Sequence, residues 1–425
     1  MKVLAIYALP SFWSMGEGKG ATAFSRTLEA LARAGHQVDV SLPAEPAEPS
    51  EADGRAKEPG AGSPSRTSLI ESFAGCALHR TSTRRSFLPD ANLPLLQRLW
   101  SRWENWRAYQ SWGYAAAVDR ARAVRPDLVL ALGVFEAPVA RRLAVELGVA
   151  NATRLFGNNL SLNLGDPLRY YANFPEIAAF RTRTQLLLLT NDGANGAEVV
   201  RRCRVDPGVF HHLRNGLEFD RFAPGPRETA IRTRLGLAPG DPLLITVTRL
   251  ADEKKLERAI ATLKGLRDRY PGARLALLGD GPERATLERA AEAMQVSAQV
   301  DFVGAVHQAE LPEWYRSADF VLSLLDRTNA SNPVFEAMAC ARVVAALDVG
   351  TTREVVQAGR TGVLLRTEDL PQLGAMLAAL FADRLRMEQM GRAAHDHIRT
   401  LLVDPAARLA QEVALYERAA AKGMA

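Results

Sequence analysis

The sequence has little of what marks secreted, membrane-spanning or metal-binding proteins. It contains three cysteines, Cys76, Cys203 and Cys340, which are too few and too scattered for a disulfide framework or a metal site, so we expect buried, reduced thiols. No apolar run reaches membrane-spanning length. The first residues, MKVLAIYALP, lead directly into a glycine-rich segment without the pattern of a signal peptide. These absences predict a soluble protein of the cytoplasm.

Features typical of nucleic-acid-binding proteins are also missing. Lys and Arg number 53 against 48 Asp and Glu, which gives a formal net charge of +5. Such an excess would suit an anionic ligand or a membrane surface, but it is spread along the chain rather than gathered in one stretch. No zinc-finger spacing or aromatic-basic RNA-binding motif accompanies it. We therefore expect no nucleic-acid partner.

What the chain does contain is enough apolar sequence for two domains. Its 425 residues are 47% hydrophobic, and short apolar runs that read as buried strands alternate with amphipathic segments that read as helices. This alternation predicts an α/β fold in both halves. The segment LRNGLEFDRFAPGPRE has a turn at Asn215 and Gly216 followed by stiffening prolines. We place the domain boundary there, between residues 1–215 and 216–400.

The stretch from Asp326 to Glu354 carries the densest set of chemical features. It reads as a loop after a buried strand, then a helix opened by Asn332 and Pro333, a second strand, and a glycine turn leading into a further helix. Because the first backbone amides of a helix are free, the amides around Asn332 and Val334 can meet sugar hydroxyls or phosphate oxygens. Glu336 lies one turn inside this helix start.

The segments NPVFEAMAC and VGTTREVV resemble the C-terminal signature of glycosyltransferase family 4. These are retaining nucleotide-sugar enzymes with the GT-B fold, in which two Rossmann-like domains face each other across a cleft. The family has two glutamates eight positions apart, of which the second holds the donor ribose and the first reaches the donor sugar. Glu336 matches the second glutamate. The first falls on Thr328, which can hydrogen-bond a sugar but offers no charge, and Asp326 is the nearest acid that could replace it.

The resemblance, which covers nearly all of residues 200–400, implies roles for further residues. Arg249 and Lys254 match the cations of the family's R-L-x-x-x-K element, and cations there suit a leaving diphosphate whose charge grows as the glycosidic bond breaks. Lys255 replaces the glycine that usually comes next, and Ala341 also stands where relatives have glycine. The backbone near Gly304 is where the family reads the nucleobase.

Candidate residues in the N-terminal half follow predicted strands. Gly16, Gly18 and Lys19 lie in a loop that lacks the spacing of a dinucleotide site, and the family uses this loop beside the donor diphosphate and the acceptor. A structural glycine turn fits the same glycines. Further along, polar residues lie in or just past two other strands, where ligands of open α/β sheets bind. We expect those residues, Arg154, Asn158 and Asp192, to face the cleft and the acceptor.

Two segments of the N-terminal half stand apart from the alternation. Residues 43–66 are rich in Pro, Ala, Glu and Gly, which predicts a surface excursion or a disordered insertion, with ordered sequence resuming by about Leu95. Trp100, Trp103 and Trp106 then follow at helical spacing with arginines nearby. Such a helix suits a membrane surface or an acceptor. The commoner role of an aromatic stripe is to pack into the domain core, and we expect that role here.

These features predict a retaining glycosyltransferase that moves a sugar from a UDP- or GDP-sugar to a small-molecule, lipid or glycan acceptor. No Asp-x-Asp pair occurs in the chain, so we expect a metal-independent enzyme with no cofactor beyond the donor. The resemblance implies that the last helix, within 401–425, crosses back to the N-terminal domain. Peripheral contact with the inner face of the membrane is left open.

Two alternatives share the same architecture. A nucleotide-sugar 2-epimerase would use the same donor without an acceptor. A nucleotide-sugar-binding partner subunit with weak or no turnover would explain the missing first glutamate at Thr328. The sequence determines neither the donor base and sugar, nor the acceptor, nor the oligomeric state.

Overall fold

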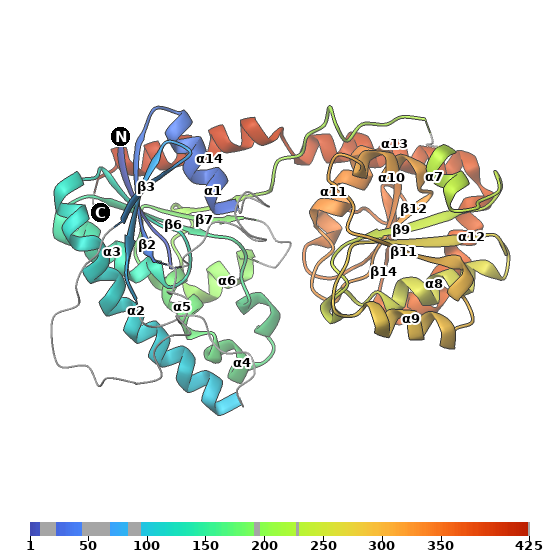
Figure 1. Ribbon diagram of the computed structural model, residues 1–425, viewed down its shortest axis with the longest axis horizontal. Helices are drawn as coiled ribbons and strands as arrows, with labels where there is room; N and C mark the ends of the chain where they lie inside the picture. The colour runs from blue at the N-terminus through green and yellow to red at the C-terminus, as the bar shows by residue number, and fades with distance from the viewer. Residues whose placement is uncertain (9–22, 45–68, 84–94, 191–195, 227–228, 424–425) are drawn as a thin grey trace, which may run out of the picture. The chain divides into compact units, whose positions relative to one another are not determined.

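The computed structural model describes residues 1–8, 23–44, 69–83, 95–190, 196–226 and 229–423, and the chain in it divides into two compact units (Figure 1). The N-terminal unit holds the described residues up to 213 together with those from 408 onward. The C-terminal unit holds residues 214–407. The division lies beside the turn at Asn215 and Gly216 at which we placed the boundary.

The N-terminal unit is built on an eight-stranded sheet in the order β3-β4-β2-β1-β5-β6-β7-β8, parallel except for the β3–β4 pair. Its strands are β1 (Lys2–Ile6), β2 (Gln37–Pro43), β3 (Leu69–Phe73), β4 (Cys76–Thr81), β5 (Leu128–Ala131), β6 (Ala150–Leu155), β7 (Leu186–Thr190) and β8 (Phe210–Leu213). Its helices include α1 (Ala23–Arg33), α2 (Leu95–Val124), α3 (Glu136–Leu147), α4 (Pro167–Ala172), α5 (Phe174–Arg181), α6 (Gly196–Cys203) and α14 (Pro405–Ala421).

The C-terminal unit has a six-stranded, fully parallel sheet in the order β11-β10-β9-β12-β13-β14. The strands are β9 (Leu243–Val247), β10 (Arg274–Leu278), β11 (Val300–Gly304), β12 (Phe320–Ser323), β13 (Val343–Leu347) and β14 (Gly362–Leu365). The helices are α7 (Thr229–Arg234), α8 (Glu257–Arg267), α9 (Arg284–Ala293), α10 (Leu311–Ser317), α11 (Asn332–Ala339), α12 (Leu373–Ala382) and α13 (Arg384–Leu401).

Each sheet is covered by helices on both faces, which explains the nearly continuous apolar runs of its strands. In β7, Leu187 and Leu189 pack into the core on one face, while Leu186 and Leu188 pack into the core on the other. A strand buried on both sides gains stability from every residue, so apolar residues need not alternate with polar ones. The two units thus have the α/β, Rossmann-like architecture that the sequence predicts.

The stretch around α11 folds nearly as expected. Strand β12, helix α11 and strand β13 occur at the predicted positions, although the N-cap is Ser331 and Asn332 is the first helical residue. The expected helix after Gly350 is instead a single 3-10 turn at Thr352–Glu354. The turn stops there because its buried Thr352 hydroxyl donates to Val349 O and accepts from the backbone N of Asn329. It anchors a loop rather than extending into a helix.

Ordered structure resumes earlier than Leu95, the residue by which we expected it. Strands β3 and β4 form an antiparallel hairpin before that residue, and residues 45–68 of the predicted insertion lie outside the described part of the chain. The hairpin turn holds Ala74 and Gly75 at φ 48° and 85°, the positive values that a two-residue hairpin turn requires. The dipeptide Ala-Gly is a weak turn signal, since glycine supplies only one of the two positions.

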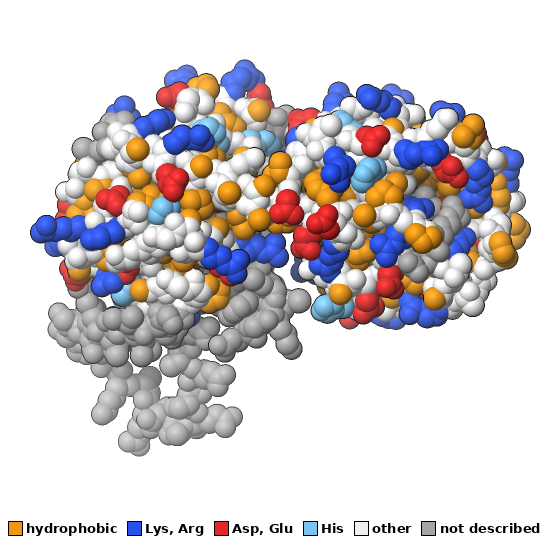
Figure 2. All heavy atoms as spheres, turned by 90° about the horizontal axis from the view of Figure 1, so that it is seen from above, with side chains coloured by type: hydrophobic (Ala, Val, Ile, Leu, Met, Phe, Trp, Pro, Cys, Tyr) orange, Lys and Arg blue, Asp and Glu red, His pale blue; other side chains and the backbone are white. Residues whose placement is uncertain are grey.

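Helix α14 follows the C-terminal unit in sequence but packs, from Arg408 onward, in the N-terminal unit. Its Tyr416 is fully buried in the core against the N-terminal sheet, and its Glu412 accepts hydrogen bonds from Thr27 and Arg154. The predicted buried thiols are confirmed, since all three cysteines are free and buried. On the face seen in Figure 2, basic and acidic side chains are interspersed over both units.

Candidate functional site

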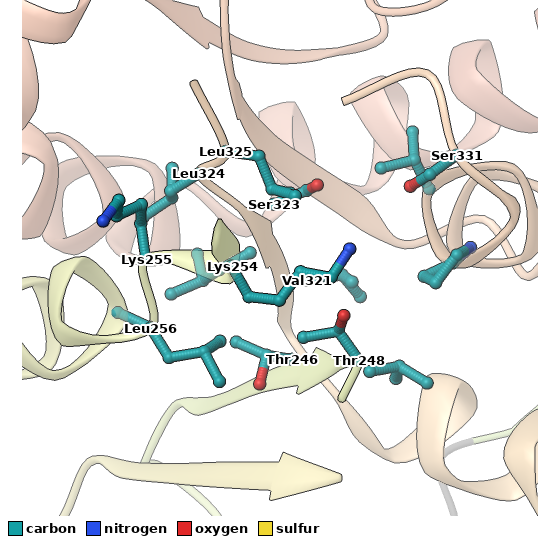
Figure 3. Close-up of a pocket in the computed structure, with 15 residues that line it drawn as sticks. Thr246, Thr248, Lys254, Lys255, Leu256, Val321, Ser323, Leu324, Leu325 and Ser331 are labelled. Atoms are coloured by element: carbon teal, nitrogen blue, oxygen red, sulfur yellow. The ribbon is translucent and has the colours of Figure 1, made fainter. Parts of the chain in front are cut away.

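A pocket of about 120 Å³ lies in the C-terminal unit beyond the carboxyl ends of β9 and β12 (Figure 3). Its lining comes from four places that are far apart in sequence: the end of β9, the segment that opens α8, β12 with its following loop, and the start of α11. Figure 3 shows the labelled side chains around one space, with Lys255 and Ser331 on opposite sides of it.

The strand order explains why a pocket forms here. From β9 the chain moves outward to β10 and β11 on one side, and it then returns to place β12 on the other side of β9. The connections therefore leave β9 and β12 in opposite directions, and a crevice opens between them at their carboxyl ends. Open α/β sheets bind ligands at this topological switch point.

All the charged side chains that line the pocket are positive. Lys254 and Lys255 line it, and no carboxylate lies among the lining residues. The Lys255 backbone adopts φ 50° and ψ 44°, a left-handed conformation that glycine adopts more easily. The Lys255 ammonium pairs with Asp252 at 2.8 Å, at the outer side of the turn. Lys254 is therefore the lysine that can bind an anion in the pocket without first breaking the ion pair that Lys255 forms with Asp252.

Hydroxyl and amide groups complete the pocket. The start of α11 contributes Ser331, Pro333 and Val334 to the lining. The Ser331 hydroxyl makes no capping hydrogen bond, and Pro333 has no N–H, so the amide of Val334 is the inner donor at this helix start. The hydroxyl of Thr246, which also lines the pocket, is buried without a hydrogen-bond partner among the described residues. Buried hydroxyls without a partner are uncommon, which makes Thr246 a candidate ligand contact.

The loop that presents α11 is held by a buried asparagine that the sequence reasoning missed. Asn329 donates to the carbonyls of Leu325 and Leu347 and accepts from Ser323 and the Leu325 amide. Its own amide donates to Thr352. An asparagine between a strand and a helix is a turn signal, but only the folded loop shows that all its polar atoms are used.

Glu336 lies on the buried side of α11 rather than in the pocket lining. One carboxylate oxygen accepts a 2.7 Å hydrogen bond from the fully buried Tyr315 hydroxyl on α10. Burial raises the pKa of Glu336, and the Tyr315 hydrogen bond and the charge of Arg221 oppose that rise. The geometry leaves Glu336 one turn inside the helix start, as the sequence predicts, with one oxygen already engaged.

Arg249 and Gly304 lie outside the pocket lining. The Arg249 side chain is 68% exposed and pairs with Glu253 at 3.0 Å, so a ligand that uses it must compete with that carboxylate. Gly304 ends β11 with φ 83° and open space where a Cβ would stand. Two neighbouring glycines have a structural role, because a Cβ on Gly279 or Gly281 would come within 2.3 Å of a carbonyl oxygen of the β9 loop.

The two residues considered for the first family glutamate have local partners. The Thr328 hydroxyl accepts a 3.1 Å hydrogen bond from the Ala330 amide, which shapes the loop before α11. Asp326 pairs with Arg258 at 2.6 Å, and Arg258 also donates to the Leu324 carbonyl. A role for Asp326 in place of the family glutamate therefore requires that it leave Arg258.

The N-terminal candidates are placed differently from the expectation. The Arg154 side chain is 1% exposed and forms a 2.8 Å ion pair with Glu412, so it braces α14 against the sheet and does not face a ligand crevice. Asn158 is buried and accepts from the Ser161 amide in the turn after β6. The remaining four candidates, Gly16, Gly18, Lys19 and Asp192, lie outside the described residues.

The tryptophan stripe of α2 is only partly in the core. Trp106 contacts Phe174, but Trp100 and Trp103 are 62% and 39% exposed and contact each other at 5.4 Å between ring centroids. The expectation that the whole stripe packs inward is therefore wrong for its first two residues. The helix projects beyond the sheet at this end, because its 30 residues far exceed the length of the adjacent strands.

Residues 227–397 match the family model described as Glycosyl transferases group 1. A GDP-mannose-dependent alpha-(1-6)-phosphatidylinositol monomannoside mannosyltransferase of Mycolicibacterium smegmatis is 30% identical over 318 residues, which are 68% of this chain and 82% of that protein. A D-inositol 3-phosphate glycosyltransferase of Nocardia farcinica is 34% identical over 218 residues, 49% of this chain and 48% of that protein.

Among solved structures, sucrose-phosphate synthase from Thermosynechococcus elongatus superposes with a TM-score of 0.70 at 18% identity. The superposition covers 99% of each chain, so the similarity extends over both units. Across the described residues, no helix combines the length and the apolarity needed to cross a bilayer.

Proposed function

The chain belongs to the group 1 glycosyl transferases, and on that premise we propose that it is a family 4 enzyme that moves a sugar from a nucleoside-diphosphate sugar to an acceptor hydroxyl. Its two Rossmann-like units match the GT-B architecture of glycosyltransferase structures. The observation that carries the proposal is the pocket at the β9–β12 switch point, which combines two lysines, a helix start and the unpartnered Thr246 hydroxyl.

In this proposal the donor diphosphate lies over the start of α11. The ammonium of Lys254 and the amide of Val334 neutralise the charge that grows on the leaving diphosphate as the sugar carbon–oxygen bond breaks. Arg249 joins them by exchanging Glu253 for a phosphate, because its long side chain is exposed and free to turn. The Glu336 carboxylate accepts hydrogen bonds from the hydroxyls of the donor ribose.

The chemistry we propose is retaining and metal-independent. The leaving phosphate oxygen takes the proton of the acceptor hydroxyl, and the new carbon–oxygen bond forms on the face of the sugar from which the diphosphate departs. This route needs no side-chain nucleophile, which agrees with Thr328 standing where relatives have a glutamate. The role of Lys254 and Arg249 is then purely electrostatic and selective for the transition state.

We propose a GDP- or UDP-sugar as donor and an acceptor that is presented at a membrane surface. The M. smegmatis relative is GDP-mannose-dependent and acts on a phosphatidylinositol derivative, as its name states. In this chain, Trp100 and Trp103 on α2 are joined by Leu168 and Tyr171 on α4, which are 69% and 64% exposed. We call these four residues the aromatic patch. Arg102 ties the two helices together through hydrogen bonds to the Ala172 carbonyl and to Asn173.

The aromatic patch lies on the side of the N-terminal sheet where a ligand is expected. Helix α2 leads into β5 and α4 follows β6, so the start of α2 and all of α4 extend from the carboxyl-end side of the strands (Figure 1). Exposed tryptophan and tyrosine beside arginine suit the head-group region of a bilayer. A protein bound there by this patch would hold its sheet edge toward lipid-linked acceptors.

The direct test is to follow transfer from GDP-mannose and from UDP-glucose to lipid and soluble acceptors and to read the anomeric configuration of the product by NMR. We expect retention. Replacing Lys254 by alanine should lower kcat/KM by about tenfold or more, since a charge-assisted contact is worth about 1.5–3 kcal/mol. The control is Lys264→Ala, which removes an exposed lysine of α8 outside the pocket. Full activity in Lys254→Ala would contradict the proposal.

The same assay separates the two alternatives. Isomerised donor in the absence of acceptor would identify a 2-epimerase. The partner-subunit alternative has one observation in its favour, the uncharged Thr328 at the position of the first glutamate. This alternative predicts that the protein binds the donor and that Lys254→Ala weakens the binding. It also predicts that no sugar is transferred to any acceptor.

A further inference from the structure

A second pocket, of about 320 Å³, lies in the N-terminal unit at the amino ends of β7 and β8. Four arginines line it, Arg141, Arg181, Arg183 and Arg204, against one carboxylate, Asp206. Ligand crevices of open α/β sheets lie at the opposite edge, beyond the carboxyl ends of the strands. The pocket is therefore separate from any acceptor crevice of this sheet and from the β9–β12 pocket of the other unit.

The charges in this pocket are not neutralised by the protein. Among the described residues, none of the four arginine side chains forms an ion pair or a hydrogen bond. The single carboxylate, Asp206, offsets at most one of the four positive charges, and one of its oxygens already accepts a 2.8 Å hydrogen bond from the Gly208 amide in its own turn. Four like charges around one space repel each other, and an anion between them would remove that repulsion.

Arg141 gives the strongest indication that this pocket binds an anion. It lies on α3, whose packing buries one guanidinium nitrogen, and that Nη1 has no hydrogen-bond partner among the described residues. A buried N–H that lacks an acceptor costs free energy, so native proteins rarely leave one unsatisfied unless a water or ion meets it. Because Arg141 also lines the pocket, an anion bound in the pocket is the natural acceptor for this nitrogen.

Other arginines of the same unit show the contrast. Six of them pair with a carboxylate at 2.8 Å or less: Arg33–Glu29, Arg120–Asp39, Arg122–Glu146, Arg154–Glu412, Arg201–Glu198 and Arg408–Glu412. The four pocket arginines, by contrast, have no such pair among the described residues.

We propose that this pocket binds a phosphate or diphosphate group, carried either by a soluble molecule or by a lipid head group. Phosphate is the anion that best fits several guanidinium groups, because its oxygens accept the paired N–H bonds of each planar fork. The site is additional to the transferase reaction, and it stands whether or not the proposed function holds.

The test titrates inorganic pyrophosphate by calorimetry into the full chain carrying Lys254→Ala, which weakens anion binding at the β9–β12 pocket without adding a second diphosphate that could compete for the arginine pocket. We expect the double variant Arg141→Gln/Arg183→Gln to bind pyrophosphate at least tenfold more weakly, or about 1.4 kcal/mol. The matched control, Arg33→Gln/Arg122→Gln, removes the same charge from this unit outside the pocket and should leave the affinity unchanged. Equal affinities in all three proteins, or equal weakening in both variants, would overturn the proposal.

A second arm separates the two sources of the phosphate. Vesicles containing phosphatidic acid are compared with phosphatidylcholine vesicles, and selective loss of phosphatidic acid binding in the pocket variant would assign the site to a lipid head group. Should the double variant fail to fold, Arg204→Gly replaces it. Arg204 has φ 57°, which glycine adopts without strain, so this variant loses one pocket charge and keeps the backbone. Unchanged binding of both probes in Arg204→Gly would count against the site.

Discussion

At the scale of single residues, the carboxylate of Glu336 has two partners to serve. It accepts a hydrogen bond from the buried Tyr315 hydroxyl, and we propose that it also accepts hydrogen bonds from the ribose hydroxyls of the donor. Glu336→Ala should therefore lower kcat/KM by about tenfold or more and also destabilise the fold by about 1–3 kcal/mol, because the Tyr315 hydroxyl loses its acceptor. Steady-state kinetics and denaturant unfolding measure the two effects.

Tyr315→Phe is the matched variant for this prediction. It removes the same hydrogen bond from the protein side while leaving the carboxylate in place. We expect Tyr315→Phe to share part of the stability loss and to keep activity within a few-fold. If both variants lose activity equally, the carboxylate acts through the fold and not through the donor.

Ala341 occupies a backbone position that disfavours side chains. Its φ is 56°, in the left-handed region, where residues other than glycine pay roughly 1–2 kcal/mol. Glycine also makes the unfolded chain more flexible, which offsets about 0.4–1 kcal/mol. We expect Ala341→Gly to raise the free energy of unfolding by roughly 0.5–1 kcal/mol in urea titration. The neighbouring Ala339→Gly, inside α11, should lower it; a loss of stability in both would contradict this account.

Glu136 predicts a dependence of stability on pH. Burial raises its pKa from 4.5 to about 8, although its carboxylate accepts a 2.7 Å hydrogen bond from the Ala8 amide. Between these two values the folded state holds a proton that the unfolded chain has released. Stability is therefore highest below pH 4.5 for this group and falls as pH rises toward 8, by at most about 1.4 kcal/mol per unit.

Glu136→Gln removes the titrating group and should flatten that part of the pH profile, measured by urea unfolding at a series of pH values. The titratable groups around it are Tyr7 and Tyr109, which burial keeps neutral over this range by raising each pKa. Glu198→Gln, at a partly exposed glutamate paired with Arg201, should keep the wild-type profile. A wild-type profile in Glu136→Gln would show that another group causes the fall.

At the scale of elements, the aromatic patch on α2 and α4 is where the fold departs most from ordinary packing. Trp100→Ala/Trp103→Ala should weaken binding to vesicles that contain phosphatidylglycerol by at least tenfold, measured by co-sedimentation, because two exposed indoles are lost from the contact. Transfer to a soluble acceptor should be unchanged. The control, Met376→Ala/Leu385→Ala, removes two exposed apolar side chains from the other unit. Vesicle binding that survives in the patch variant would rule out this surface.

At the scale of the whole molecule, the two units have separate sheets and separate hydrophobic cores, and we propose a separate role for each unit. The pocket that we propose for the donor is built entirely from residues of the C-terminal unit, so a nucleoside diphosphate should stabilise that unit in particular. At about 100 times its Kd the ligand should add about 2.7 kcal/mol, seen as slower hydrogen exchange within residues 214–407. We expect the same protection in EDTA, as metal independence requires. Protection that EDTA abolishes would show that a divalent ion completes the site.

The elements around the site followed from the sequence because their causes are local. The apolar runs of β12 and β13 and the proline that opens α11 determine strand and helix without reference to the rest of the chain. The hairpin β3–β4 was not predicted because its turn signal is weak and because it joins the sheet through the pairing of β4 with β2, which is distant in sequence.

The hydrogen bonds and ion pairs of buried side chains could not be predicted from the sequence, because they join residues that are distant along the chain. Arg154 was expected to face a ligand, but it pairs with Glu412, 258 positions away. Likewise the polar atoms of Asn329 are satisfied by Leu347 and Thr352, which a later strand and turn bring to it.

The sequence by itself determined the alternating α/β architecture, the helix start at Asn332 and the lysine at 254, since periodicity and turn chemistry act over a few residues. Only the tertiary structure decided which polar groups share a pocket. Strand order places the ends of β9 and β12 together, and helix packing leaves Arg141 among three other unpaired arginines. Burial and pairing are properties of long-range packing, and no local pattern records them.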